Sequence, residues 1–238
     1  EAASSLGDRG AFVGLAGAFG TVTLGSSVLS PSFYARAATD PSTTNNYGIA
    51  KFGGATRLDN SINYTSPNFA GVTLRASLVQ KDDNGGKNAT DVSVSYVNGP
   101  LTLGASSADN GKAEGKGSFV GAAYDLGMAK VFVNSVKATG TPAVAAAAAV
   151  PAVPGNAGTA AVTAADAVKG LEYTSFGVSA PFGATTLQAD YRTAKDKADD
   201  TYVLSAQYAL SKRTSLTAYT AKTEGAKAAM GAGVRHNF

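Results

Sequence analysis

The stretch "DTYVLSAQYALSKRTSLTAYTAK", residues 200–222, shows the clearest structural pattern in the chain. In its first half one set of side chains is mainly aromatic or aliphatic and takes every second position: Tyr202, Leu204, Ala206 and Tyr208. The positions between them hold Val203, Ser205 and Gln207. Alternation with a period of two is typical of a β-strand that turns one face to an apolar environment. After the short "LSKR" the alternation resumes over 214–222, so the stretch indicates two antiparallel strands joined by a tight turn.

The same pattern recurs along the whole chain, and it predicts thirteen strands with no convincing helix. The predicted strands are 11–17, 20–26, 57–66, 72–80, 91–97, 101–107, 117–125, 129–137, 171–180, 185–193, 200–209, 214–222 and 230–238.

The connections between these strands alternate between short turns, such as "NGP" and "DLGM", and longer segments, such as 27–56 and 138–170. This alternation predicts an all-β, up-and-down antiparallel transmembrane β-barrel, with periplasmic turns at one end and extracellular loops at the other. Greek-key crossings in a sandwich give no reason for such regularity. A soluble β-sandwich nevertheless stays open as an alternative, because a strand with one apolar face also suits a sheet that covers a core.

Composition excludes several classes of function. The chain has no cysteine, so disulfides, thiolate nucleophiles and sulfur-bound metals are excluded. Its net charge of +3 comes from 20 basic and 17 acidic residues with no basic block, which gives no indication of a nucleic-acid partner. The single histidine, His236, has no serine and acid arranged around it, and "KDDNGGKNATD" at 81–91 lacks the ligand spacing of a calcium loop. We therefore expect no enzyme, no metal and no cofactor.

The direction of the strands predicts an incomplete barrel. With thirteen strands, the first and the last run in the same direction, whereas a closed single-chain barrel of this type has an even number. Lipid cannot satisfy an open sheet edge, so we expect an odd number of strands to precede Glu1.

Four blocks in the same order resemble the general-diffusion porins of β-proteobacteria, the trimeric Gram-negative porin family. The blocks are "RGAFVGLAGAFGTVTLGSS" (9–27), "RLDNSINYTSPNFAGVTLRASL" (57–78), "LSAQYALSKRTSLTAY" (204–219) and "GVRHNF" (233–238). The resemblance implies one 16-stranded barrel domain over 1–238 that lacks three N-terminal strands and a signal peptide. It also implies a homotrimer in the outer membrane, in contact with lipid and lipopolysaccharide.

The resemblance assigns roles to one loop and to the last residue. Segment 27–56 takes the place of the loop that folds inward and narrows the pore, and it carries Tyr34, Arg36 and Asp40. For segment 138–170 the prediction comes from the residues themselves, since its low complexity and its place among the longer connections indicate an extracellular loop. Porins end on an aromatic residue that the outer-membrane assembly machinery reads, and here that residue is Phe238.

Alternation places a set of charged side chains on the lumen face. In 57–66 the face that holds Arg57 and Asp59 is opposite Leu58, Ile62 and Tyr64. The same rule turns a further set inward: Arg75, Lys130, Asp190, Arg192 and Arg235. Arg9 is ambiguous, because either Phe12 or Val13 is the outward residue of its strand. The alternative is that these arginines are hydrated wall residues that pair with Asp59 or Asp190.

These assignments predict that the protein is a passive channel for small hydrophilic solutes and ions. The named basic residues outnumber the acidic ones, so we expect a weak anion preference. The alternative is a structural or adhesive outer-membrane barrel with a plugged lumen that acts through 138–170.

Overall fold

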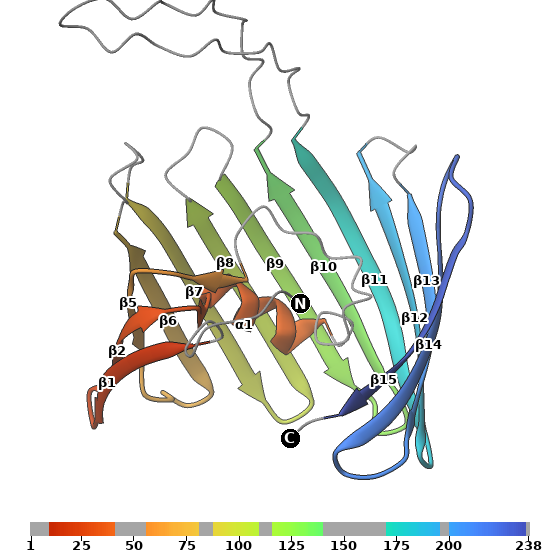
Figure 1. Ribbon diagram of the computed structural model, residues 1–238, viewed down its shortest axis with the longest axis horizontal. Coiled ribbons are helices and arrows are strands. Elements are labelled where there is room, and N and C mark those ends of the chain that lie inside the picture. Colours follow the sequence, from red (N-terminus) through yellow and green to blue (C-terminus); the bar gives the residue numbers. More distant parts are fainter. Residues whose placement is uncertain are drawn as a thin grey trace, which may run out of the picture.

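The computed structural model describes residues 10–40, 56–80, 88–109, 116–139, 170–195 and 200–236. Within them, one antiparallel sheet of thirteen strands follows the order of the chain, each strand pairing with the next along the sheet. Figure 1 shows this sheet curling around a short helix, α1, that lies on its concave side. The predicted up-and-down β architecture is confirmed.

Twelve of the thirteen strands of the sheet match the predicted ranges closely, and the exception is the predicted strand 57–66. They are β1 (Ala11–Gly17), β2 (Gly20–Ser26), β5 (Ser61–Thr65), β6 (Val72–Val79), β7 (Ala89–Asn98), β8 (Leu101–Asp109), β9 (Lys116–Asp125), β10 (Lys130–Ala138), β11 (Leu171–Phe182), β12 (Thr185–Ala194), β13 (Thr201–Ala209), β14 (Thr214–Thr223) and β15 (Ala229–His236).

Short turns join the strands at one end of the sheet and longer connections join them at the other, as predicted. The turn between β11 and β12 consists only of Gly183 and Ala184. Gly183 has φ of 60°, a left-handed conformation that glycine adopts without steric penalty. Such tight turns keep neighbouring strands antiparallel and fix their register.

The two faces of the sheet differ in the way that the alternation predicted. On the convex face, apolar side chains are open to the surroundings: Val120 is 62% exposed and Leu204 is 53% exposed. On the concave face, polar side chains such as Ser93 and Asn134 are buried. A soluble sandwich would bury its apolar face, so this inverted arrangement argues against that alternative.

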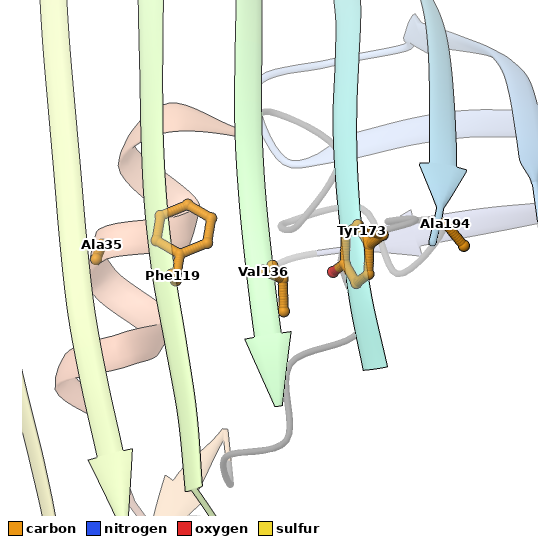
Figure 2. Close-up of a cluster of buried hydrophobic side chains, with 5 residues drawn as sticks. All are labelled: Ala35, Phe119, Val136, Tyr173 and Ala194. Carbon is orange, nitrogen blue, oxygen red and sulfur yellow. The ribbon is translucent and has the colours of Figure 1, made fainter. Parts of the chain in front are cut away.

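Few large apolar side chains are buried in the described part of the chain. Figure 2 shows a cluster on the concave side, drawn from α1 and from strands β9 to β12. Its members are Ala35, Phe119, Val136, Tyr173 and Ala194. Ala35 and Phe119 are the members at the helix, whereas Tyr173 and Ala194 lie farther along the sheet (Figure 2).

The helix α1 (Pro31–Thr39) was not predicted, and the expectation of thirteen strands with no convincing helix is wrong on this point. Ser30 caps its N-terminus, since its side chain accepts a hydrogen bond from the backbone N–H of Phe33 at 3.1 Å. Pro31 follows at the first helical position, where a missing N–H costs nothing. The buried positions Ser32, Ala35, Arg36 and Thr39 recur at helical spacing and form one stripe.

The prediction of one continuous strand over 57–66 is also wrong. The structure has β4 (Arg57–Leu58), which pairs with β3 (Val28–Leu29) in a separate two-stranded sheet, and then β5. The break lies at Asn60, whose φ of 50° is left-handed and incompatible with a strand. Arg57 therefore belongs to the base of the inward segment and not to a strand of the main sheet.

Candidate functional site: the concave face and the inward helix

The concave face is lined by small polar side chains that suit contact with water. Buried members include Ser61, Asn63, Ser77, Ser93, Ser95, Thr102, Ser106, Asn134, Ser175, Gln188, Thr201, Ser215 and Thr217. Hydroxyl and amide groups of this kind line the interior of aqueous barrel channels, whereas the opposite face meets lipid. The face is therefore the candidate functional surface, and α1 is the element that lies on it.

The N-terminal end of α1 is bound to strand β7 through Asp91. Its Oδ1 atom accepts hydrogen bonds from the Ser32 backbone N–H at 3.0 Å and from the Ser32 hydroxyl at 2.6 Å. All three groups are buried, so the two bonds are shielded from competing water. A carboxylate in this position also interacts favourably with the positive end of the helix dipole.

The C-terminal end of α1 is bound to strand β10 through Asn134. The Thr39 hydroxyl donates to Asn134 Oδ1 at 3.0 Å, and both side chains are buried. The helix then ends at Asp40, whose backbone N–H donates to the carbonyl oxygen of Arg36 at 2.7 Å. Both ends of the helix are thus fixed to the sheet by side-chain hydrogen bonds.

The chain leaves and rejoins the sheet through a narrow neck, which we define as Ser26, Ser27, Arg57 and Asp59. Asp59 Oδ1 accepts from the Ser26 hydroxyl and from the Ser27 backbone N–H, each at 2.7 Å. Arg57 Nη1 donates to the carbonyl oxygen of Ser27 at 2.7 Å. The two sides of the inward segment are therefore tied together where it departs from the wall.

A cavity of about 410 Å³ lies between α1, the neck and strands β1, β2, β5 and β6. Tyr34, Arg57 and Arg75 all line it. The Arg75 guanidinium carbon lies 4.5 Å from the centroid of the Tyr34 ring, a cation–π arrangement that orients the guanidinium. The rest of the lining is mixed, with polar side chains such as Thr23 and Asn63 and apolar ones such as Val28 and Leu29. The structure thus brings two of the predicted wall arginines to one cavity beside the predicted inward loop.

A second group of charges lies on β11 and β12, where Tyr173 and Asp190 interact electrostatically with Asp40 at the C-terminal end of α1. The Arg192 guanidinium carbon lies 5.2 Å from the centroid of the Tyr173 ring. Gln188 Nε2 donates to both carboxylate oxygens of Asp190, at 3.2 and 3.0 Å.

Burial lowers the pKa of the Arg36 guanidinium below its ordinary value, while Tyr173, Asp40 and Asp91 act in the opposite direction. An arginine remains charged even so, because its ordinary pKa is far above neutrality.

The remaining predicted residues lie apart from these two groups or outside the described residues. Lys130 pairs with Ser179 near the short-turn end of β10, on the face that holds Phe132 and Asn134. Arg235 is opposite Ser215 and lines a separate cavity at the short-turn end of β13 and β14. Arg9 and Phe238 fall outside the described residues, and so does most of 138–170.

The ambiguity in the first strand is resolved by its pairing. Val13 is opposite Leu24, which is exposed on the convex face. Phe12 is opposite Gly25 and lines the cavity beside α1 with Thr23. Val13 is therefore the outward residue of the two.

Sequence reasoning missed the residues that hold the helix, above all Ser32, Thr39, Asp91 and Asn134. A signal for the helix itself was present, since "SPSFYARAAT" places a capping serine and a proline ahead of good helix formers. Asp91 and Asn134 carried no such signal. Each is one polar residue among others on an alternating strand, and only the fold shows that it faces α1.

Within the ranges that the structure describes, there is no group of three or more His, Cys, Asp or Glu side chains that could hold a metal ion. Nor does that part of the chain contain a helix long and apolar enough to cross a membrane.

A curled sheet with an apolar convex face, a polar concave face and a helix fixed inside it defines a class of protein, the membrane β-barrel with an aqueous lumen. The model of the Gram-negative porin family matches residues 1–228. The chain belongs to that family. It is accordingly a multi-pass β-barrel protein of the outer membrane that forms a diffusion channel, and membership indicates a channel rather than an enzyme.

Solved porins share the fold at low sequence identity. The anion-selective porin from Comamonas acidovorans is 21% identical with a TM-score of 0.62, and the match covers 95% of this chain and 77% of that one. A triple mutant of the Rhodopseudomonas blastica porin is 18% identical with a TM-score of 0.61, covering 92% and 73%. Salmonella typhi OmpF in complex with daunomycin is 14% identical with a TM-score of 0.64, covering 90% and 70%. Among the curated proteins, none matches this chain.

Proposed function

We propose that the protein is a passive channel with a weak anion preference, and that segment 27–56 is its constriction loop. The observation that carries the proposal is the cavity beside α1, which Arg57 and Arg75 line together with Tyr34. Guanidinium groups in a narrow aqueous passage attract anions more strongly than in bulk water, because the surrounding protein lowers the effective dielectric constant.

The balance of charge on the named residues supports the preference and also limits its strength. The basic set is Arg36, Arg57, Arg75, Lys130, Arg192 and Arg235, and the acidic set is Asp40, Asp59, Asp91 and Asp190. Most of the acidic charges lie close to basic ones around α1 and the neck. The excess of positive charge is therefore small. The Comamonas relative, which shares the fold, bears the description anion-selective.

Planar-bilayer recording tests both parts of the proposal. The protein should give stepwise conductance, and a potassium chloride gradient should give a reversal potential of the sign for chloride preference. A reversal potential of the opposite sign would overturn the anion preference. Absence of steps would overturn the channel and favour the plugged, adhesive barrel that acts through 138–170.

We further propose that the protein is a homotrimer in contact with outer-membrane lipid and lipopolysaccharide, and that Phe238 is read by the outer-membrane assembly machinery. The support is the block resemblance and the terminal "GVRHNF". Native mass measurement in detergent tests the trimer. For Phe238, the Phe238→Ala variant should reach the outer membrane in smaller amounts than the unsubstituted protein.

A further inference from the structure

On the inner face of the sheet, two glycines lie directly opposite each other in neighbouring strands: Gly104 in β8 and Gly121 in β9. Both are buried beneath α1. Glycine weakens a strand because it has no side chain to pack, so a paired couple in mid-sheet marks a place where another part of the chain comes close.

The approach of α1 leaves no room for a side chain at either position. A β-carbon at Gly104 would lie 2.7 Å from the carbonyl oxygen of Ala35 and 3.3 Å from Thr39 Cγ2. A β-carbon at Gly121 would lie 2.5 Å from Thr39 Oγ1 and would also collide with Asn134 Oδ1. Real β-carbons essentially never come closer than 3.0 Å to such atoms.

Thr39 is the residue that fits over the glycine pair. Its methyl group points at Gly104 and its hydroxyl at Gly121, and the side chain is 0% exposed. Ala35 lies one helical turn earlier on the same stripe and rests its carbonyl oxygen over Gly104. At the glycine pair the helix is therefore in contact with bare backbone rather than with side chains.

We propose that Gly104 and Gly121 form a seat that sets how far α1 projects into the lumen, and so sets the size limit of the channel. The proposal rests on the proposed role of 27–56 as the constriction loop. The hydrogen bonds of Ser32 to Asp91 and of Thr39 to Asn134 hold the two ends of the helix. Between these ends, the seat fixes the distance of the helix from the sheet.

The obstacle differs between the two positions. At Gly104 the closest atom belongs to the backbone of the helix, so an added methyl group must move α1 away from the wall. At Gly121 the closest atoms belong to three side chains, those of Asn134, Thr39 and Phe119, and a side chain can shift more easily than a backbone. Gly104 is therefore the stricter of the two positioning residues.

The test compares Gly104→Ala and Gly104→Val with a matched control, Gly233→Ala. Gly233 lies on the inner face of β15, where a β-carbon would meet only Thr217 Oγ1, at 3.7 Å. The readouts are single-channel conductance and the rates at which sugars of increasing size enter liposomes, with β-structure checked by circular dichroism.

We expect the unsubstituted protein to have the highest conductance, Gly104→Ala a lower one and Gly104→Val the lowest, at about half the unsubstituted value. The reason is that a narrower aqueous passage conducts less. Large sugars should lose more rate than small ones, and Gly233→Ala should match the unsubstituted protein. Unchanged size discrimination in the Gly104 variants, or a rise in conductance, would overturn the proposal. Absence of conductance in the unsubstituted protein would instead overturn the proposed function, and this inference with it.

Gly104→Ala keeps the test decisive if Gly104→Val does not fold. Its single added methyl group already meets the carbonyl oxygen of Ala35 at 2.7 Å, so this variant alone should lower conductance and slow large sugars more than small ones. A Gly104→Ala protein that folds and matches Gly233→Ala in both readouts would contradict the seat.

Discussion

At the scale of single residues, the charge that separates anions from cations is carried by groups whose orientation is fixed. Arg75 is the clearest case, because the Tyr34 ring holds its guanidinium at the cavity beside α1. Its position on the inner face was predictable from alternation alone. Its contact with Tyr34 was not, because the two residues are far apart in the sequence.

We expect Arg75→Gln to shift the reversal potential toward cation preference while conductance stays within about twofold, since one wall charge is removed without a large change in volume. The control is Lys137→Gln, which removes a charge from the outward face of β10. An equal shift in both variants would show that overall charge, and not the cavity, sets the preference.

Asp91 is a second residue whose role belongs to this scale. Asp91→Ala removes the acceptor of both Ser32 hydrogen bonds and leaves buried donors unpaired, which costs about 1–3 kcal/mol. Asp91→Asn keeps an acceptor oxygen. We therefore expect open-channel noise to increase in the alanine variant, as the end of α1 moves, and much less in the asparagine variant. Equal noise in the two variants would mean that the charge of Asp91, and not its hydrogen bonds, steadies the helix.

At the scale of elements, the strands were predictable and the inward segment was not. Along the strands, apolar side chains that face outward alternate with polar side chains that face inward. The strands β1 and β2 begin and end at the residues where this alternation begins and ends. In 27–60 the local signals compete. The alternation of "RLDNSINYT" continues through Asn60, but tertiary hydrogen bonds to Asp59 interrupt the strand there. A pattern of side chains does not reveal a backbone break that is caused by partners about thirty residues away.

The neck is the element that directs the inward segment, and Ser27 within it and Asn60 directly after it have left-handed φ values of 58° and 50°. Such conformations persist only where surrounding contacts hold them. We expect Asp59→Ala to release the neck, raise conductance fluctuations and admit larger sugars, because it removes the acceptor for Ser26 and Ser27. Ser27→Gly suits the left-handed backbone and should leave conductance unchanged. Identical behaviour of Asp59→Ala and the unsubstituted protein would show that the bonds at the two ends of α1 suffice to place it.

At the scale of the whole molecule, the inverted distribution of apolar and polar side chains is what makes the protein a membrane barrel. The convex face gains stability from lipid and the concave face from water, so neighbouring residues of one strand should respond oppositely to the same substitution. Leu204 and Ser205 are such neighbours in β13, with Leu204 exposed on the convex face and Ser205 turned inward.

We expect Leu204→Arg to destabilise the protein folded in lipid by roughly 2–4 kcal/mol, because it places a charge in the hydrocarbon region. Ser205→Arg adds the same group to the aqueous face and should leave the free energy of unfolding nearly unchanged while increasing anion preference. Urea titration of the reconstituted protein measures the first effect, and the reversal potential measures the second. A soluble sandwich predicts the opposite order, because an arginine at a solvent-exposed position costs little, whereas one added to a packed interior is destabilising. The ranking of these two variants therefore decides which face of the sheet meets lipid, independently of any likeness to known porins.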